Sequence, residues 1–370
     1  MKIVADKNIP YLRGITEQFG EVEYIAGNEF TKEAIKDADT LIVRTVTFFG
    51  KELLEGTNVK LICSATIGFD HIDTEYCDTH GIKWYNAPGC NSGSVMQYII
   101  SSLFIIARRK SFDLKDKTIG IIGVGNVGKK VARACRILGM RVLLNDPPRQ
   151  EVEGDNEFVD IDTIKRESDI ITFHTPLTKN GKYKTHHLAD ESFFNSLGKN
   201  PLIINSARGG IIKTEAIKDA IRTGKISGTV IDCWENEPGI DQEYMRMTDI
   251  ATPHIAGYSA DGKANATRMS LQNIARFWHL DESAVNDIVV PAIADHLIDM
   301  SNISQAEQLE KVILKTYNPE NDCKPLLANP SSFSALRGEY PLRREYNAYT
   351  VTNVADKLSG LLSNLGFKVE

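Results

Sequence analysis

Three glycines with the spacing Gly-x-Gly-x-x-Gly constrain the fold of this chain more than any other feature. Gly123, Gly125 and Gly128 directly follow the apolar run 118–122, which predicts a buried strand, and they precede a helical pattern over residues 129–138. This order is typical of the first strand–turn–helix unit of a Rossmann-like domain. There the glycines let the backbone approach a pyrophosphate, which the helix N-terminus attracts. The turn therefore predicts a dinucleotide-binding site.

The next strand, over residues 141–145, ends at an acid that refines this prediction. Asp146 follows Gly128 by 18 residues. A carboxylate there can accept hydrogen bonds from the ribose hydroxyls and would repel the additional phosphate of NADP. We therefore expect NAD as the cofactor. Arg149 is the one nearby residue that favours NADP instead.

Short apolar runs alternate with helical patterns over most of the chain. Residues 1–95 show this alternation, and four more strands follow the glycine turn. Such alternation predicts parallel sheets, with ligands beyond the carboxyl ends of the strands. The alternation stops near residue 280. After it we expect a helix at 305–316, a loop at 318–332, and then a strand, a helix and a last short strand.

Bulk properties exclude several classes of protein. The formal net charge is −6, so there is no basic excess for nucleic-acid binding. The six cysteines are scattered without metal or redox spacing, and His71, His186 and His187 form no familiar ligand set. The sequence does not begin with a basic segment followed by an apolar run, so we expect no signal peptide. We expect a cytoplasmic protein without a metal site or a membrane partner.

Three residues near the ends of later predicted strands could carry acid–base chemistry. Arg208 could hold a carboxylate through two parallel hydrogen bonds. His254 could exchange a proton with a hydroxyl, and Glu237 could fix its tautomer and favour its charged form. Asp232 ends a strand and could face a nicotinamide or a ribose. Arg208 could instead form an ordinary surface salt bridge, His254 could be a buried, hydrogen-bonded histidine, and Glu237 could be a solvated acid.

The motifs together resemble those of the D-isomer-specific 2-hydroxyacid dehydrogenases, over roughly residues 1–280. The matching segments occur in the family's order: 123–128, 174–177, 205–209, 232–238 and 252–257. The resemblance implies that Arg208 binds the substrate carboxylate and that Glu237 raises the pKa of His254. His254 would then exchange the proton of the C2 hydroxyl while hydride passes to NAD.

Other segments resemble one branch of this family, which acts on a phosphorylated hydroxy acid. These segments are 43–47, 65–71, 87–91, 183–185, 254–258, 336–337 and 342–345. The resemblance implies substrate contacts at Thr45, Thr66 and Tyr258. It implies NAD contacts at Asn126, Val127, Asp146, Thr175, Ser206, Ala207, Arg208, Asp232 and Gly257.

The resemblance also implies the fold class and the domains. We predict an α/β protein with a flavodoxin-like substrate domain and an NAD-binding Rossmann domain, each with a parallel sheet, followed by a small α+β domain for homodimerisation. The expected boundaries are 1–95 completed by about 258–282, then 96–257, then 283–370. Closure on ligand would hinge near residues 91–94 and 257–262.

A substrate with a carboxylate at one end and a phosphate at the other needs two cationic anchors. Arg208 would supply one. We expect Arg44, together with Arg337, Arg343 or Arg344 from the tail, to supply the other, and a dimer partner could contribute the tail residue. For the tail arginines, interface salt bridges are an equally good interpretation.

Two alternative functions stay open at this point. One is a D-3-phosphoglycerate or hydroxypyruvate dehydrogenase, which would share the mechanism. Thr66, where many family members have glycine, and the unusual tail favour the phosphorylated hydroxy acid instead. The other is an NAD-sensing scaffold that does not need the three catalytic side chains.

Overall fold

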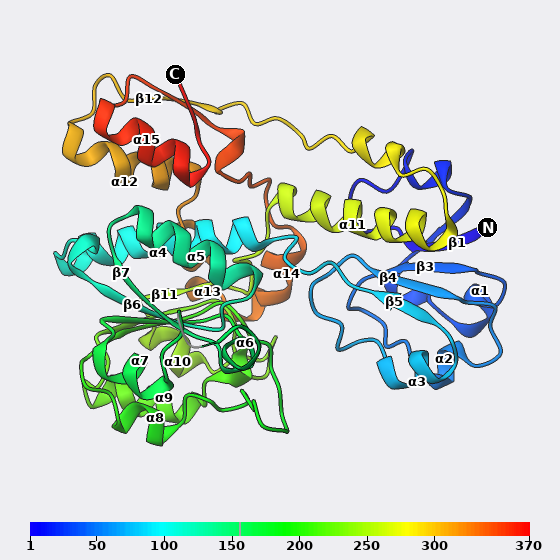
Figure 1. Cartoon of the computed structure of the whole chain (residues 1–370), viewed down its shortest axis with the longest axis horizontal. Helices are drawn as coiled ribbons and strands as arrows, with labels where there is room; N and C mark the ends of the chain where they lie inside the picture. The colour runs from blue at the N-terminus through cyan, green and yellow to red at the C-terminus, as the bar shows by residue number, and fades with distance from the viewer. Residues whose placement is uncertain (155–156) are drawn as a thin grey trace. The chain divides into compact units, whose positions relative to one another are not determined.

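The computed structural model describes residues 1–154 and 157–370. The chain divides into two compact units (Figure 1). Unit 1 contains residues 1–91 and 259–292, and unit 2 contains residues 92–258 and 293–370. The tail, which we expected to be a domain of its own, therefore groups with the glycine-turn domain. Its independence as a folding unit stays a prediction.

Unit 1 is built on a five-stranded parallel sheet with the strand order β2-β1-β3-β4-β5. This order is the flavodoxin-like one, as predicted. The strands are β1 Lys2–Asp6, β2 Glu21–Ile25, β3 Thr40–Val43, β4 Leu61–Ser64 and β5 Lys83–Tyr85. The helices are α1 Lys32–Ile35, α2 Lys51–Leu54, α3 Thr74–Thr79 and α11 Ala260–Trp278.

The sheet of unit 1 is buried on both faces because alternate side chains of each strand enter different cores. Ile3 and Ile42 pack with Leu271 of α11 on one face. Val4 and Leu41, their neighbours in sequence, pack in a separate cluster on the other face. This two-residue period explains why the strands read as continuous apolar runs.

Unit 2 contains a six-stranded parallel sheet with the order β11-β10-β9-β8-β6-β7. An isolated parallel bridge between Leu144 and Phe158 continues the sheet beyond β7. The order reverses direction between β6 and β8, and ligands bind at this kind of switch point. The strands are β6 Thr118–Ile122, β7 Arg141–Asn145, β8 Ile170–Phe173, β9 Leu202–Asn205, β10 Gly228–Ile231 and β11 Ile250–Ala251.

Helices cover both faces of this sheet, with α4 and α5 on one side and α7 to α9 on the other (Figure 1). The helix after the glycine turn begins at Asn126, three residues before the predicted start at 129. The helices are α4 Ser92–Lys110, α5 Asn126–Ile137, α6 Pro147–Glu153, α7 Ile161–Glu167, α8 Glu191–Asn195, α9 Thr214–Arg222 and α10 Gln242–Met247. Together the two sheets confirm the predicted α/β class.

The tail adds a small parallel sheet with the order β12-β13-β14. Its strands are β12 Leu297–Asp299, β13 Thr350–Thr352 and β14 Lys368–Val369. Its helices are α12 Gln305–Thr316, α13 Glu320–Ala328, α14 Phe333–Gly338 and α15 Asp356–Leu365. The helix expected at 305–316 and the final strand, helix and strand are present.

The loop predicted at 318–332 is wrong, because α13 occupies most of it. Pro325 lies inside this helix, where it removes a backbone hydrogen bond. Packing compensates for this loss: Cys323 and Leu326 are buried, and the Cys323 sulfur accepts a hydrogen bond from the Ala251 N–H of β11 at 3.4 Å. Tertiary contacts therefore outweigh the local signal of the proline.

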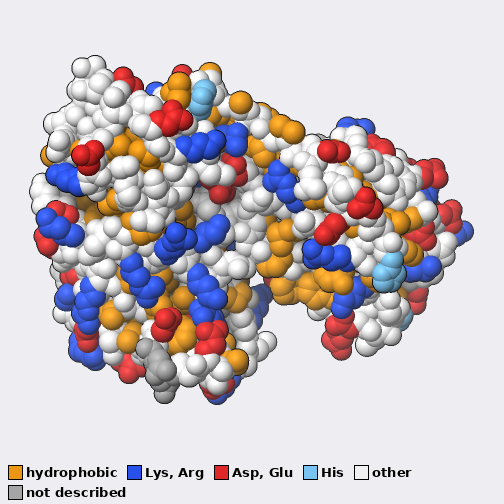
Figure 2. All heavy atoms as spheres, turned by 45° about the horizontal axis from the view of Figure 1, so that its top comes forward, with side chains coloured by type: hydrophobic (Ala, Val, Ile, Leu, Met, Phe, Trp, Pro, Cys, Tyr) orange, Lys and Arg blue, Asp and Glu red, His pale blue; other side chains and the backbone are white. Residues whose placement is uncertain are grey.

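The described residues include no helix that is both long and apolar enough to cross a membrane. Acidic and basic side chains lie beside one another over both units in the face that Figure 2 shows. This mixture agrees with the modest net charge of −6.

Candidate active site

The glycine turn joins β6 to α5 in the geometry that the sequence predicts. Gly123 has a φ of +89°, which favours glycine. A Cβ on Gly128 would lie 2.1 Å from the Gly123 carbonyl oxygen, so the packing of helix on turn requires glycine there as well. A Cβ on Gly125 would meet no atom within 4 Å. Gly125 therefore leaves open space at the N-terminus of α5, where a ligand backbone could approach.

Two buried hydroxyl groups follow the neighbouring strands β8 and β9 of the same sheet. Thr175 follows β8 and Ser206 follows β9, and both hydroxyl oxygens are buried without a hydrogen-bond partner among the described residues. An unsatisfied buried hydroxyl is destabilising, so such groups commonly mark a ligand site. Together with the exposed first turn of α5 at Asn126 and the half-buried Val127, they fit a bound dinucleotide.

Asp146 lies at the predicted ribose position and caps the following helix. Its carboxylate accepts hydrogen bonds from the Val124 N–H at 2.7 Å and from the Arg149 N–H at 3.2 Å. The Arg149 guanidinium in turn pairs with Glu153 and donates to the Val124 carbonyl at 2.6 Å. The one residue that favoured NADP is thus engaged within the protein, which agrees with NAD.

The predicted acid–base pair is formed. His254 Nδ1 lies 2.7 Å from Glu237 Oε2, and the Trp234 N–H donates to Glu237 Oε1 at 2.8 Å. Burial raises the pKa of Glu237, but the hydrogen bond and charge of His254, the Trp234 N–H and the charge of Arg337 outweigh burial and lower that pKa overall. The carboxylate is therefore ionised and fixes the imidazole. His254 Nε2 has no hydrogen-bond partner in the described chain, which leaves it available for proton exchange.

Asp232 holds the loop that carries His254. The residue is fully buried, and its carboxylate accepts hydrogen bonds from the Thr252 hydroxyl at 2.7 Å and from the N–H groups of Ile255 and Ala256 at 2.8 and 2.9 Å. These bonds bracket His254, whose φ of +57° is uncommon for a residue with a side chain. Burial raises the pKa of Asp232 despite these donors. The structure thus gives Asp232 a supporting role, and its contact with NAD stays a prediction.

Arg208 extends from the turn after β9. The Asn205 side chain shapes this turn by donating to the Arg208 carbonyl at 2.9 Å and accepting from the Ala207 N–H at 3.1 Å. The half-buried Arg208 guanidinium makes one hydrogen bond within the described residues, from Nη1 to the Ala207 carbonyl at 2.8 Å. Its other N–H groups can therefore bind a carboxylate.

Cys233 lies beside the Glu237–His254 pair and was not among the predicted site residues. Its sulfur and the nearest atoms of Glu237 and His254 all lie within 4.8 Å of one another. Burial, together with Asp232 and Glu237, raises the pKa of the Cys233 thiol. A metal would need the thiolate and would compete with the Glu237–His254 hydrogen bond, so the donor set favours an acid–base pair over a metal site. No spacing in the sequence pointed to Cys233.

Tyr258 and one tail arginine meet beside this pair. Arg337 Nη2, from α14, donates to the Tyr258 hydroxyl at 3.2 Å, and its charge acts on Glu237. Arg343 has a different role: it is buried and donates to the carbonyls of Ser94 and Ile255 and to the side chain of Gln97. Among the three tail arginines of the hypothesis, Arg337 is therefore the one at the predicted substrate contact.

The predicted substrate contacts of unit 1 are engaged with their own neighbours or exposed. Arg44 forms two hydrogen bonds with the buried carboxylate of Asp6, at 2.8 and 3.2 Å. The Thr66 hydroxyl donates to the Gly68 carbonyl at 2.9 Å and lies 2.6 Å from the Ser64 hydroxyl. Thr45 is exposed. The ion pair weakens the hypothesis that Arg44 anchors a substrate phosphate, and the roles of all three residues stay predictions.

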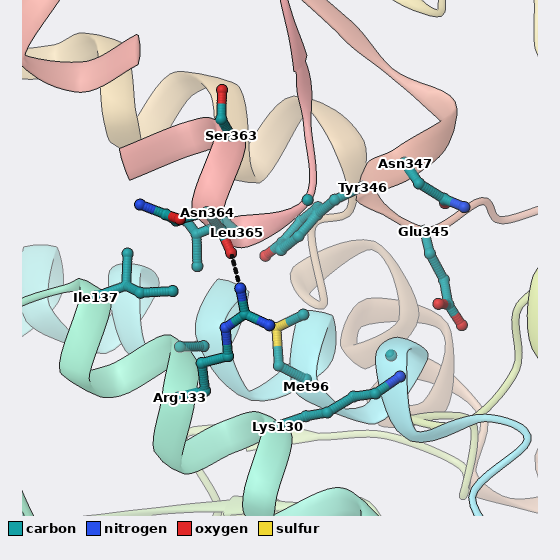
Figure 3. A pocket seen from close by; sticks show the side chains of 13 residues that line it. Met96, Lys130, Arg133, Ile137, Glu345, Tyr346, Asn347, Ser363, Asn364 and Leu365 are labelled. Atoms are coloured by element: carbon teal, nitrogen blue, oxygen red, sulfur yellow. Dashed lines mark hydrogen bonds between the residues drawn. The ribbon is translucent and has the colours of Figure 1, made fainter. Parts of the chain in front are cut away.

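A separate pocket of about 290 Å³ lies between α4, α5 and the tail (Figure 3). Lys130 and Arg133 enter it from α5, and Arg133 donates to the Asn364 carbonyl at 3.5 Å. Glu345 and Tyr346 line it from the tail. None of the predicted site residues belongs to its described lining, so it is not the candidate active site.

Comparison with known proteins identifies the family. Residues 105–256 match the family described as D-isomer specific 2-hydroxyacid dehydrogenase, NAD binding domain, and residues 289–366 match a domain of unknown function. Among solved structures, the chain is similar to NAD-bound 3-phosphoglycerate dehydrogenase of Entamoeba histolytica, with 28% identity, a TM-score of 0.64, and coverage of 79% of this chain and 99% of that one. It is also similar to NAD-dependent formate dehydrogenase of Staphylococcus aureus in complex with NAD, with 25% identity, a TM-score of 0.61, and coverage of 75% and 96%.

Several closer sequence relatives are named erythronate-4-phosphate dehydrogenase. The protein of Bacteroides thetaiotaomicron is 54% identical over 96% of this chain and all of its own length. That of Porphyromonas gingivalis is 42% identical over 99% of this chain and all of its own length. The chain therefore belongs to the erythronate-4-phosphate dehydrogenases, NAD-dependent oxidoreductases of the D-isomer-specific 2-hydroxyacid dehydrogenase family.

Proposed function

We propose that this protein oxidises 4-phospho-D-erythronate to (R)-3-hydroxy-2-oxo-4-phosphooxybutanoate in the biosynthesis of pyridoxal 5′-phosphate, vitamin B6. The observation that carries the proposal is the 2.7 Å hydrogen bond between His254 and Glu237, on a loop held by Asp232. The names of relatives at 42–54% identity support the choice of substrate.

The catalytic assignment follows from what each side chain can do. His254 Nε2 accepts the proton of the C2 hydroxyl, because Nδ1 is engaged by Glu237. The ionised Glu237 stabilises the imidazolium that forms and holds its tautomer. Arg208 binds the substrate carboxylate through its remaining N–H groups, which orients C2. NAD, when bound, would supply the acceptor for the hydride that leaves C2.

The cofactor contacts follow the glycine turn and the unsatisfied hydroxyls. The exposed N-terminus of α5 would hold the pyrophosphate, and Asp146 would accept hydrogen bonds from the ribose hydroxyls. Thr175 and Ser206 would gain from the cofactor the hydrogen bonds that they lack among the described residues. Ala207, Asp232 and Gly257 complete the proposed set.

Two further parts of the proposal concern the assembly and its location. We assign homodimerisation to the tail, at residues 283–370, and place the protein in the cytoplasm. The six cysteines are buried and form no disulfide among the described residues, which supports a reducing compartment. Light scattering of the full-length protein at several concentrations tests the dimer, and a monomer at all concentrations would overturn it.

The first experiment is NADH formation with three candidate substrates in parallel. D-erythronate 4-phosphate should be oxidised with a much higher kcat/KM than D-3-phosphoglycerate or unphosphorylated D-erythronate. A 2-oxo acid acceptor belongs in a parallel reaction, because tightly held NADH would mask turnover. Preference for phosphoglycerate would keep the mechanism but change the substrate. Inactivity with all three would support the scaffold alternative.

A further inference from the structure

We propose that Arg337 of the tail binds the phosphate group of the substrate, opposite the carboxylate that Arg208 holds. The tail then supplies a specificity-determining residue of the active site from within the same chain. This inference rests on the proposed function and deepens it, because it identifies which residue selects a doubly anionic substrate.

The first observation is the position of Arg337. It lies in α14 and donates from Nη2 to the hydroxyl of Tyr258 at 3.2 Å, although the two residues are 79 positions apart in the sequence. Tyr258 follows His254 by four residues, so this contact brings α14 to the segment that carries the acid–base histidine.

The second observation is an unsatisfied donor. Arg337 Nε is buried and has no hydrogen-bond partner among the described residues, and no carboxylate pairs with the guanidinium there. A buried charged donor without a partner is costly, whereas a phosphate oxygen would satisfy it and use the fork geometry of the guanidinium. An anionic ligand at this position would supply the hydrogen bond that Arg337 Nε lacks.

The third observation is the charge arrangement. Burial and the charges of Asp232 and Glu237 raise the pKa of the Cys233 thiol, whereas the charges of Arg208 and Arg337 lower it, so both cations act on the cluster of Cys233, Glu237 and His254. They reach it from separate elements, the turn after β9 and the tail helix α14. We place a short substrate with an anionic group at each end between these two cations, with its reacting carbon near His254.

Aromatic rings also support the guanidinium of Arg337. Its carbon lies 5.8 Å from the ring centroids of both Tyr258 and Phe333. Tyr340 packs edge-on against Tyr258 at 5.6 Å. Cation–π contacts hold the side chain without neutralising it, so little ordering is needed when an anion binds.

Two of the other arginines considered for this role are already engaged. Arg44 pairs with the buried Asp6, and Arg343 is buried against main-chain carbonyls and Gln97. The charge of Arg44 is therefore already balanced by Asp6, and all three side-chain nitrogens of Arg343 donate hydrogen bonds. Arg337 is therefore the stronger candidate for the phosphate anchor.

The test compares Arg337→Met and Arg337→Lys with the parent protein. We expect Arg337→Met to raise KM for D-erythronate 4-phosphate roughly 10- to 100-fold, as expected for a lost charge-assisted hydrogen bond. The inhibition constant of unphosphorylated D-erythronate should change less than about 3-fold, and competitive inhibition by inorganic phosphate should weaken. Arg337→Lys should lie between, because a lysine keeps the charge but loses the fork.

Two control variants separate binding from positioning. Tyr258→Phe removes the hydroxyl that Arg337 contacts and keeps the guanidinium, while Arg276→Met removes an exposed arginine of unit 1. If Arg337 acts only through Tyr258, Arg337→Met and Tyr258→Phe will weaken phosphorylated and unphosphorylated ligands by the same factor, and the inference is overturned. Unchanged phosphate inhibition in Arg337→Met would also overturn it. An inactive parent protein would instead contradict the proposed function.

Discussion

The two units carry similar parallel sheets. The predicted site residues at their strand ends differ in whether the protein itself completes their hydrogen bonds. In unit 1, Arg44 is paired with the buried Asp6, and the Thr66 hydroxyl is bonded to its own turn. In unit 2, the buried hydroxyls of Thr175 and Ser206 lack partners among the described residues. Both regions follow the rule that polar residues gather at the carboxyl ends of parallel strands.

The difference shows that position at a strand end is not enough to assign a ligand contact. A polar group whose hydrogen bonds are already complete stabilises the fold, whereas a buried group with unmet hydrogen bonds gains a partner when ligand binds. By this criterion, unit 2 holds the groups best prepared to bind, and Arg44 is better explained as the ion-pair partner of the buried Asp6. Each prediction below tests one side of this contrast.

The largest effect should come from His254. His254→Gln removes the proton acceptor, so kcat/KM should fall about 10²- to 10⁴-fold. NAD binding and the melting temperature should stay close to those of the parent protein. His296→Gln, in the exposed start of the tail sheet, is the matched control. Full activity of His254→Gln would remove the acid–base assignment and favour the scaffold alternative.

Removing the Arg44 guanidinium should mainly affect stability. Arg44→Met leaves the Asp6 carboxylate buried without its partner, which should lower the free energy of unfolding by about 2–3 kcal/mol. The double variant Asp6→Asn, Arg44→Met should recover much of this loss, as denaturant titrations would show. If the single variant is fully stable but binds D-erythronate 4-phosphate more weakly, Arg44 belongs to the binding groups and the contrast between the units fails.

Glu237→Gln keeps the shape of the side chain and removes its charge. We expect kcat to fall about 10- to 100-fold, because the imidazolium loses its counter-charge. The pKa of Glu237 is lowered in the folded protein, so its contribution to stability is present above the ordinary carboxyl range and is lost as the pH falls through the folded value. The stability difference between the parent and Glu237→Gln should therefore shrink under acid conditions. A difference that is constant with pH would argue against an ionised pair.

The smallest effects should come from the unsatisfied hydroxyls. Ser206→Ala and Thr175→Val remove groups without partners, so the protein alone should be as stable as the parent, or up to about 1 kcal/mol more stable. The dissociation constant for NAD should rise roughly 3- to 10-fold, as measured by calorimetry. Thr252→Val is the control, since its hydroxyl donates to Asp232 and its loss should be destabilising. If all three variants lose stability to a similar extent, the Ser206 and Thr175 hydroxyls stabilise the fold and do not indicate a ligand site.

Much of the fold followed from the sequence because its signals are local. The strand before Gly123, the helix after it and the acid at Asp146 are consecutive, and the catalytic motifs each follow a strand. The pairing of Glu237 with His254 could be expected because both lie in recognisable segments. The loop expected at 318–332 failed because Pro325 is a local signal, whereas the packing of α13 on β11 is not.

The remaining site features depend on contacts between distant segments. No sequence pattern indicates that Arg337 reaches Tyr258 or that Cys233 touches the Glu237–His254 pair. The pairing of Arg44 with Asp6 was hidden for the same reason, because 38 residues separate them and only the sheet order makes them neighbours. Such side chains can be nominated by charge, but their partners require the fold.

The buried guanidinium of Arg343 links the tail to the loop of His254, so the two segments should evolve together. It joins the main chain of α4 to the carbonyl of Ile255, directly after His254, and stacks 3.7 Å from the centroid of Tyr317. A truncated gene product would lose this brace, and a tail transplanted onto a relative without matching carbonyls and Gln97 would bring an uncompensated charge into its core. The tail and the histidine loop should therefore be inherited together. In shuffled libraries of this family, active chimaeras should arise mainly when both segments come from the same parent.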